Sequence, residues 1–162
     1  MSVVDVHSVQ ISRWRWRRLM LELSSRGRGK RESGAFLLAR TDTSSRRVAR
    51  AVFFDDLDAD ALNGAVSIRG EAFARLWQIC ERHRMRVIAD VHTHPGSGVA
   101  QSSIDTSNPM VARRGHVAII VPHFARRSTH PRNIGFHVYQ GDQTWTKAFG
   151  EQAAALLCRT WW

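Results

Sequence analysis

Apolar residues near the start of the chain repeat at helical spacing. Counting from position 16, the residues at i, i+3, i+4 and i+7 share one face of a helix: Trp16, Leu19, Met20 and Leu23. Ser12 precedes this run, and its side chain can accept a hydrogen bond from a backbone amide that the first turn of a helix leaves free. The pattern therefore predicts a helix that begins after Ser12 and ends in the basic segment SSRGRGKRE.

A second amphipathic pattern opens at Gly70 and Glu71 and ends near Arg84. The apolar face that it predicts consists of Phe73, Leu76, Trp77 and Cys80. Two further short helices are expected, one over residues 109–114 and one in the C-terminal segment GEQAAALLCRTWW. The acidic segment DDLDAD, which precedes the second helix, is expected to be a loop.

Short apolar or alternating runs predict strands between these helices. The runs cover residues 3–9, 34–40, 47–54, 85–92, 116–122, 135–140 and 144–149. Gly141 and Asp142 separate the last two runs and favour a hairpin. Helices interleaved with neighbouring strands predict a single α/β or α+β domain over residues 1–162, with a mixed sheet flanked by helices.

Composition excludes several classes of protein. The hydrophobic fraction of 43% and the charged fraction of 23% are those of a folded globular domain rather than a disordered chain. The longest uncharged apolar stretch, residues 117–122, is too short to span a bilayer, and the N-terminus has no signal-peptide pattern. Cys80 and Cys158 are too few and too far apart for a disulfide scaffold. We therefore expect a cytoplasmic protein with no membrane partner.

Basic residues outnumber acidic ones, which gives the chain a formal charge of +10. Of the 24 basic residues 22 are arginines, and several surround Trp14 and Trp16. This surplus favours an acidic partner such as nucleic acid, on whose bases tryptophan can stack. A GC-rich genome, which encodes arginine in place of lysine, explains the same surplus equally well, so both explanations stay open.

The segment VHTHPGSGVAQSSID carries the candidate chemistry. His92 and His94 are two residues apart, so on a strand their imidazoles point to the same face, and Pro95 ends the strand. Asp105 lies eleven residues after His94, within reach of the same metal ion. Two histidines and one carboxylate leave a fourth tetrahedral position open, as a catalytic zinc ion requires, and zinc lowers the pKa of a bound water to about 7.

Hydrolysis also needs a base and a donor that stabilises negative charge. Glu32 is the best candidate for the base because it directly precedes the apolar strand at 34–40. Glu71 and Glu81 fall on the surface of the second helix and are weaker candidates. Ser102 lies three residues before Asp105, where its hydroxyl can donate to an oxyanion. The remaining histidines, His116 and His137 among them, show no ligand spacing and are expected to be structural or exposed.

The spacing H-x-H-P, six residues, then S-x-x-D resembles the motif of the JAB/MPN (JAMM) zinc metalloproteases. His92, His94, Pro95, Ser102 and Asp105 occupy its fixed positions. The strand segment ESGAFLLAR and the later HVAIIVP also resemble the family, so the resemblance covers roughly residues 5–140.

The resemblance implies a cytidine-deaminase-like fold with a curved mixed sheet. It implies that His92, His94 and Asp105 bind Zn²⁺, that Glu32 is general base and acid, and that Ser102 stabilises the oxyanion. The implied activity is cleavage after the C-terminal glycine of a ubiquitin-like protein. Compactness and the arginine content suggest a bacterial deconjugating peptidase, in a modification pathway with E1- and E2-like enzymes and with an antiphage role in some cases.

Two other functions remain open. The charge and the Trp/Arg helix suggest a nucleic-acid-associated member of the same fold, and some members of the family are non-catalytic scaffolds. A nucleobase deaminase is excluded because its P-C-x-x-C ligands are missing. Few residues separate Asp105 from the next strand, so we expect none of the long insertions that read ubiquitin chain linkage.

Overall fold

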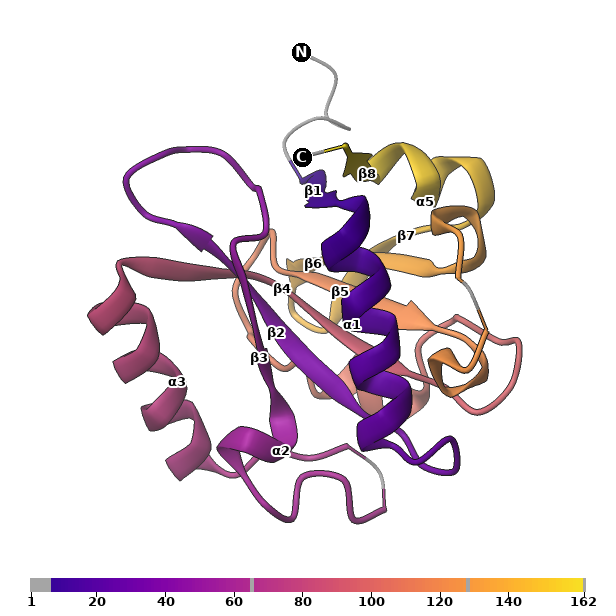
Figure 1. Ribbon diagram of the computed structural model, residues 1–162, viewed down its shortest axis with the longest axis horizontal. Coiled ribbons are helices and arrows are strands. Elements are labelled where there is room, and N and C mark those ends of the chain that lie inside the picture. Colours follow the sequence, from indigo (N-terminus) through magenta and orange to yellow (C-terminus); the bar gives the residue numbers. More distant parts are fainter. Residues whose placement is uncertain (1–6, 65, 128, 162) are drawn as a thin grey trace.

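A six-stranded mixed sheet forms the centre of the fold in the computed structural model, which describes residues 7–64, 66–127 and 129–161 (Figure 1). The strand order is β3-β2-β4-β5-β6-β7, and only β4 and β5 are parallel. The strands are β2 (Gly34–Arg40), β3 (Arg50–Phe53), β4 (Met85–Thr93), β5 (Val117–Val121), β6 (Gly135–Gly141) and β7 (Thr144–Ala148). The predicted mixed sheet flanked by helices is confirmed.

One face of the sheet is covered by α1 (Arg13–Arg26), as Figure 1 shows. The four apolar residues of the predicted stripe are all buried: Trp16, Leu19, Met20 and Leu23. Ser12 caps the helix by accepting a hydrogen bond from the amide of Arg15. The stripe packs on Ala35, Leu37 and Ala39 of β2, so this helix is confirmed with its cap and its buried face.

The opposite face is covered by α3 (Gly70–His83), which buries Ala72, Leu76 and Cys80. These side chains share a core cluster with residues of β2 and β3. Trp77 was predicted on the buried face, but 47% of its surface is exposed. The helix presents Ala72, Leu76 and Cys80, spaced by four residues, to the sheet, and this leaves Trp77 about 100° to one side.

The acidic segment after β3 was predicted to be a loop, but part of it is the short helix α2 (Phe54–Leu57). Phe54 and Leu57 lie three residues apart, so one turn of helix buries both of them in the same core cluster. The burial of these two side chains explains the helix, which the acidic residues between them conceal in the sequence.

The helix predicted over residues 109–114 is wrong, because the structure places the helix earlier, at α4 (Ser103–Ser107). Ser102 and Asp105 form a reciprocal capping box, in which each side chain bonds the backbone amide of the other. The capping box therefore fixes the start of α4, and Asn108 ends it.

The C-terminal segment begins as the predicted helix, α5 (Gly150–Leu156), and then continues as β8 (Leu157–Thr160). This strand pairs in parallel with β1 (Val9–Ser12) to form a second, two-stranded sheet. Of the strand predicted at the N-terminus, residues 3–6 lie outside the described part of the chain. The hairpin of β6 and β7 is confirmed, and Gly141, with a φ of +94°, supports its turn.

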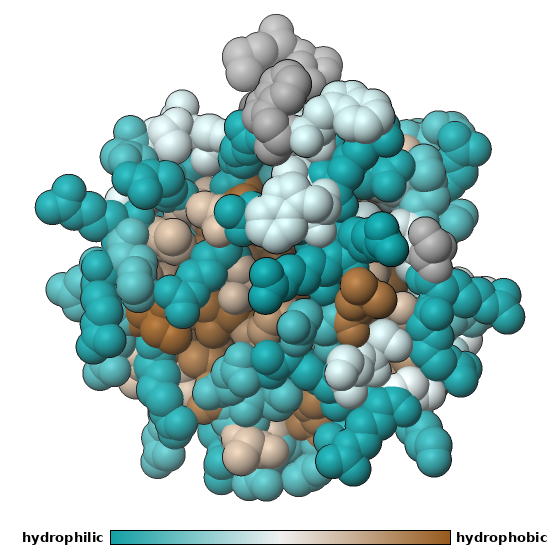
Figure 2. Space-filling view, viewed as in Figure 1, coloured by the Kyte–Doolittle hydropathy of each residue, from teal (hydrophilic) through white to brown (hydrophobic). Residues whose placement is uncertain are grey.

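Two single turns of 3₁₀-helix, η1 (His123–Ala125) and η2 (Pro131–Asn133), complete the elements. On the face that carries α1, hydrophilic residues dominate and apolar residues form small separate patches (Figure 2). No helix of the described residues is long and apolar enough to cross a membrane.

Candidate metal centre

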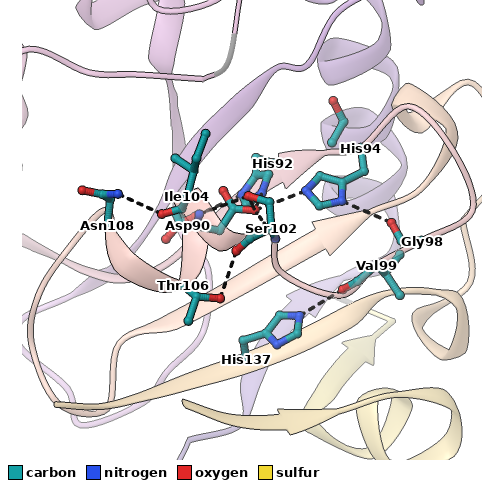
Figure 3. A network of polar contacts seen from close by, with 12 residues as sticks. Asp90, His92, His94, Gly98, Val99, Ser102, Ile104, Thr106, Asn108 and His137 are labelled. Atoms are coloured by element: carbon teal, nitrogen blue, oxygen red, sulfur yellow. Dashed lines mark hydrogen bonds and ion pairs between the residues drawn. The ribbon is translucent and has the colours of Figure 1, made fainter. Parts of the chain in front are cut away.

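His92 and His94 lie at the carboxyl end of β4, and their ring centroids are 5.2 Å apart (Figure 3). The backbone of β4 is held on both sides, since His92 pairs with Gly34 of β2 and with Ile120 of β5. A side chain at Gly34 would collide with Phe54, so glycine permits this close pairing. His92 is buried and His94 is half-buried, so the site opens at His94.

Asp105 of α4 completes the group. Its Oδ2 lies 3.6 Å from Nε2 of His92 and 3.4 Å from Nε2 of His94. One ligand atom from each residue lies within 4.8 Å of the other two. Ligand atoms bound to zinc at 2.0–2.2 Å in a tetrahedron are about 3.4 Å apart, so the three side chains have the spacing of a metal site.

One polar atom at the centre of this group has no hydrogen-bond partner among the described residues. Nε2 of His92 is buried and forms no hydrogen bond among the described residues. Buried polar atoms are nearly always bonded, so an orphaned imidazole nitrogen facing a carboxylate fits a cation between them. Nδ1 of His94 lies 3.2 Å from the carbonyl oxygen of Gly98, which directs Nε2 of that ring toward Asp105. The residues therefore fit a zinc ion.

The same contacts shift the protonation of the ligands. Burial alone would lower the pKa of His92, but Asp105 and Asp90 outweigh it and raise that pKa to about 9. Burial likewise opposes ionisation of Asp105, but His92 and His94 hold its pKa well below the usual range. A metal ion would bind the same nitrogen and oxygen atoms in place of these contacts.

Ser102 is tied to Asp105 rather than free in the site. Its hydroxyl donates to Oδ2 of Asp105 at 2.8 Å, and its backbone amide donates to the same oxygen at 2.9 Å. The structure therefore places Ser102 beside the candidate metal ligands, where it orients Asp105. Its predicted role as oxyanion donor stays a prediction.

Glu32 lines a cavity of about 620 Å³ together with His94, Ser102 and Asp105. The neighbouring residue fixes its position, because Ser33 and Thr93 exchange two hydrogen bonds. The backbone amide of Ser33 donates to Oγ1 of Thr93 at 3.0 Å, and the amide of Thr93 donates to the carbonyl oxygen of Ser33 at 2.9 Å.

The structure thus brings four of the five predicted site residues to one cavity, with His92 buried behind them. The weaker candidates for the base, Glu71 and Glu81, are exposed on α3 and do not line this cavity. The catalytic role of Glu32 stays a prediction, but its position satisfies the first requirement for that role.

Two buried residues behind His92 were missed in the sequence. Asp90 accepts from Nε2 of His116 at 2.6 Å, and its other oxygen lies 3.7 Å from Nδ1 of His92. That oxygen and Nδ1 are both buried and have no other partner among the described residues. A carboxylate behind a metal-binding imidazole fixes the orientation of the ring. One signal was visible, since Asp90 precedes His92 by two residues and so shares its face of the strand.

A third missed residue holds the loop that carries Asp105. His137 of β6 is buried, and its Nε2 lies 3.0 Å from the carbonyl oxygen of Val99, as Figure 3 shows. A side chain at Gly135 would collide with the same carbonyl. The loop between His94 and Asp105 is thus fitted closely against β6.

Comparison with models of known protein families gives no match. Among solved structures, the chain is similar to a protein from Desulfitobacterium hafniense at 13% identity and a TM-score of 0.61, covering 87% of this chain and 90% of that one. It is also similar to a protein from Salinibacter ruber at 15% identity and a TM-score of 0.58, covering 94% and 92%. A JAB1/MPN domain protein from Archaeoglobus fulgidus has 18% identity and a TM-score of 0.48, over 88% and 96%. The first two similarities establish a shared fold.

Proposed function

We propose that this protein is a zinc-dependent peptidase that cleaves after the C-terminal glycine of a ubiquitin-like protein. The observation that carries the proposal is the joint position of the metal-binding group and Glu32. His94, Asp105 and Glu32 line one open cavity, and His92 completes the ligand set from behind. The resemblance of the H-x-H-P and S-x-x-D segments to the JAB/MPN motif supports the same activity.

Zinc held by two histidines and one carboxylate supplies an acidic water and polarises a carbonyl group. The side chains of the cavity would transfer the protons and stabilise the developing negative charge. Glu32 accepts a proton from water as a C–O bond forms at the glycine carbonyl carbon, and returns it to the amine as the C–N bond breaks. The hydroxyl of Ser102 donates to Asp105 and so holds this carboxylate in place. To stabilise the tetrahedral oxygen, the same hydroxyl would turn from Asp105 and donate its one proton to that oxygen.

The surroundings of the cavity suggest how a substrate tail is held. Lys30 and Arg31, which directly precede Glu32, line the cavity together with apolar side chains, among them Leu62, Val66 and Ile104. This mixture suits an extended peptide with apolar side chains and an acidic partner surface. We place the protein in a bacterial ubiquitin-like modification pathway, where E1- and E2-like enzymes supply the conjugates and where defence against phage is one setting.

The proposal is tested with a ubiquitin-like protein fused through its terminal glycine to a reporter. We expect cleavage by the zinc-loaded protein, loss of cleavage with a chelator and recovery when zinc is added. Glu32→Gln is expected to lower the cleavage rate by about 10²–10⁴-fold with zinc still bound, because only the base is lost. Glu71→Gln, on the exposed face of α3, is the matched control and should retain full activity.

Full activity of Glu32→Gln would contradict the assignment of the base. Absence of cleavage with every glycine-ending substrate, together with salt-sensitive DNA binding, would favour the nucleic-acid-associated alternative. Absence of cleavage and of DNA binding, with zinc still bound, would favour a non-catalytic scaffold.

A further inference from the structure

A second cavity lies at the end of β4 opposite the metal centre. It encloses about 420 Å³ and lies between the amino end of β4, the last turns of α3 and the segment that leads into β5. Its volume is that of a site for a small molecule. Met85 and Val87 of β4 line it, whereas His92 and His94 lie at the other end of the same strand.

Four arginines line this cavity, and none of the acidic residues in the described part of the chain does: Arg46, Arg86, Arg113 and Arg114. None of the four forms an ion pair with any residue in the described ranges. Other arginines of the chain do find carboxylates, as Arg26 does with Asp55 and Arg69 with Asp58. Residues 7–64, 66–127 and 129–161 therefore supply no carboxylate that pairs with the positive charge around the cavity.

Two of the arginines are held in place by the main chain. The guanidinium of Arg46 donates to the carbonyl oxygens of Ser8 and Ile88, both at 3.1 Å. Arg86 donates to the carbonyl oxygens of Thr43 and Ser45, both at 2.8 Å, and to that of Arg40. Side chains that are fixed before a ligand arrives lose little entropy when it binds.

Burial of Arg46 also favours the binding of an anion. Arg46 is largely removed from water, and burial, followed by the neighbouring charge of Arg86, lowers its pKa. An anion in the cavity would relieve both effects. Arg113 and Arg114 are exposed at the rim, so their planar guanidinium groups are available to a phosphate group in bidentate fashion.

The remaining wall is apolar and aromatic. Trp77, which is exposed, lines the cavity together with Met85 and Val111. An exposed tryptophan beside arginines offers a face on which a planar ring can stack.

We propose that this cavity binds a small phosphorylated ligand with a planar aromatic part, of the class of a nucleoside monophosphate. The arginines contact the phosphate, and Trp77 stacks on the ring. None of His92, His94 and Asp105 lines this cavity, although His116, which contacts Asp90 behind His92, does. The proposal does not depend on peptidase activity.

The proposal is tested by calorimetry on the full chain with AMP, adenosine and inorganic phosphate, with EDTA present so that no metal ion binds the phosphate. We expect one AMP per chain, and adenosine and phosphate to bind at least about tenfold more weakly than AMP, because each makes only part of the contacts. The double substitution Arg113→Ser/Arg114→Ser should weaken AMP binding by about tenfold or more. Trp77→Ala should weaken binding of AMP and leave that of phosphate unchanged.

The matched control is Arg17→Ser/Arg18→Ser, which removes the same charge from the exposed face of α1. This control should bind AMP as the wild type does. Equal loss in the two double variants would overturn the proposal, because net charge alone would explain binding. It would also be overturned if AMP did not bind, or if phosphate bound as tightly as AMP. All five substituted residues are exposed, and thermal denaturation verifies that each variant is folded.

Discussion

At the scale of single residues, one substitution separates two proposed roles of Ser102. Its hydroxyl contacts Asp105 in the structure, whereas its role as oxyanion donor follows from resemblance alone. If the hydroxyl serves only the oxyanion, its loss lowers the rate and leaves the metal in place. If it orients Asp105, its loss also weakens the metal site.

We expect Ser102→Ala to weaken zinc binding as well as cleavage. Loss of the cap should cost about 1 kcal/mol of stability, and loss of a contact behind a ligand about 10–100-fold in zinc affinity. Zinc affinity measured by competition with a chelating dye checks this. Ser103→Ala, which leaves the Ser102–Asp105 pair intact, is the control. Unchanged zinc affinity in Ser102→Ala would restrict Ser102 to the oxyanion.

Asp90, which lies behind His92, is expected to raise the affinity of the same site for zinc. Asp90→Asn removes the charge next to Nδ1 of His92, so we expect zinc affinity to fall by about 10–100-fold while the fold is retained. The same dye competition measures it, with the exposed His83→Gln as the control. Wild-type affinity in Asp90→Asn would mean that the pair of Asp90 and His116 serves packing only.

The clustering of His92, His94 and Asp105 was predictable from sequence because its signals are local. The spacing of two on a strand places His92 and His94 together, and the loop after Pro95 returns Asp105. The pair of Asp90 and His116 was not predictable, because it depends on the parallel register of β4 with β5. No pattern within the sequence of either strand predicts that contact.

At the scale of elements, a buried carboxylate holds the loop between α2 and α3. Asp58 accepts hydrogen bonds from Nε and Nη2 of Arg69 at 2.8 and 2.6 Å, and one from the backbone amide of Asp60. This loop also carries Leu62 and Val66, which line the cavity of the metal centre. The carboxylate therefore supports one wall of the site.

We expect Asp58→Asn to lower the melting temperature by a few degrees at pH 7. Hydrogen bonds from Arg69 and then from Asp60 hold the pKa of Asp58 well below its usual range. A lowered carboxyl pKa stabilises the fold above the unfolded-state pKa of about 3.9, and this stabilisation is lost as the pH falls toward the folded-state pKa. The difference between wild type and variant should therefore shrink below about pH 4.

Melting curves from pH 3 to 8 check this, with the exposed Asp142→Asn as the control. A difference that stays constant over the whole range would show that the charge of Asp58 is not what stabilises the loop.

Element prediction was reliable where periodicity was strong. The stripe of α1 and the apolar runs of β2 and β5 are buried as expected. Element prediction was poor where a few tertiary contacts determine the secondary structure. Phe54 and Leu57 form a helix because both side chains are buried in the core. Helix α4 starts at a capping box of Ser102 with Asp105, two residues that the sequence predicts only as an oxyanion donor and a metal ligand.

At the scale of the whole molecule, the pairing of strands in the two sheets could not be predicted from the sequence. The pairing of β1 with β8 joins residues about 150 positions apart, and local patterns carry no information about such a contact. The sequence did predict the class of fold, because alternating strands and helices with apolar faces allow few architectures. The structure adds that both ends of β4 carry a cavity, one with the metal ligands and one with the arginines.

The central claim is that His92, His94 and Asp105 bind one zinc ion and leave one coordination position for water. Elemental analysis of protein prepared with ample zinc, joined to X-ray absorption at the zinc edge, measures this most directly. We predict one zinc per chain, with two histidines, one carboxylate and one water, and loss of the metal in His94→Ala. A protein free of stoichiometric metal, or a fourth side chain in place of the water, would contradict the account.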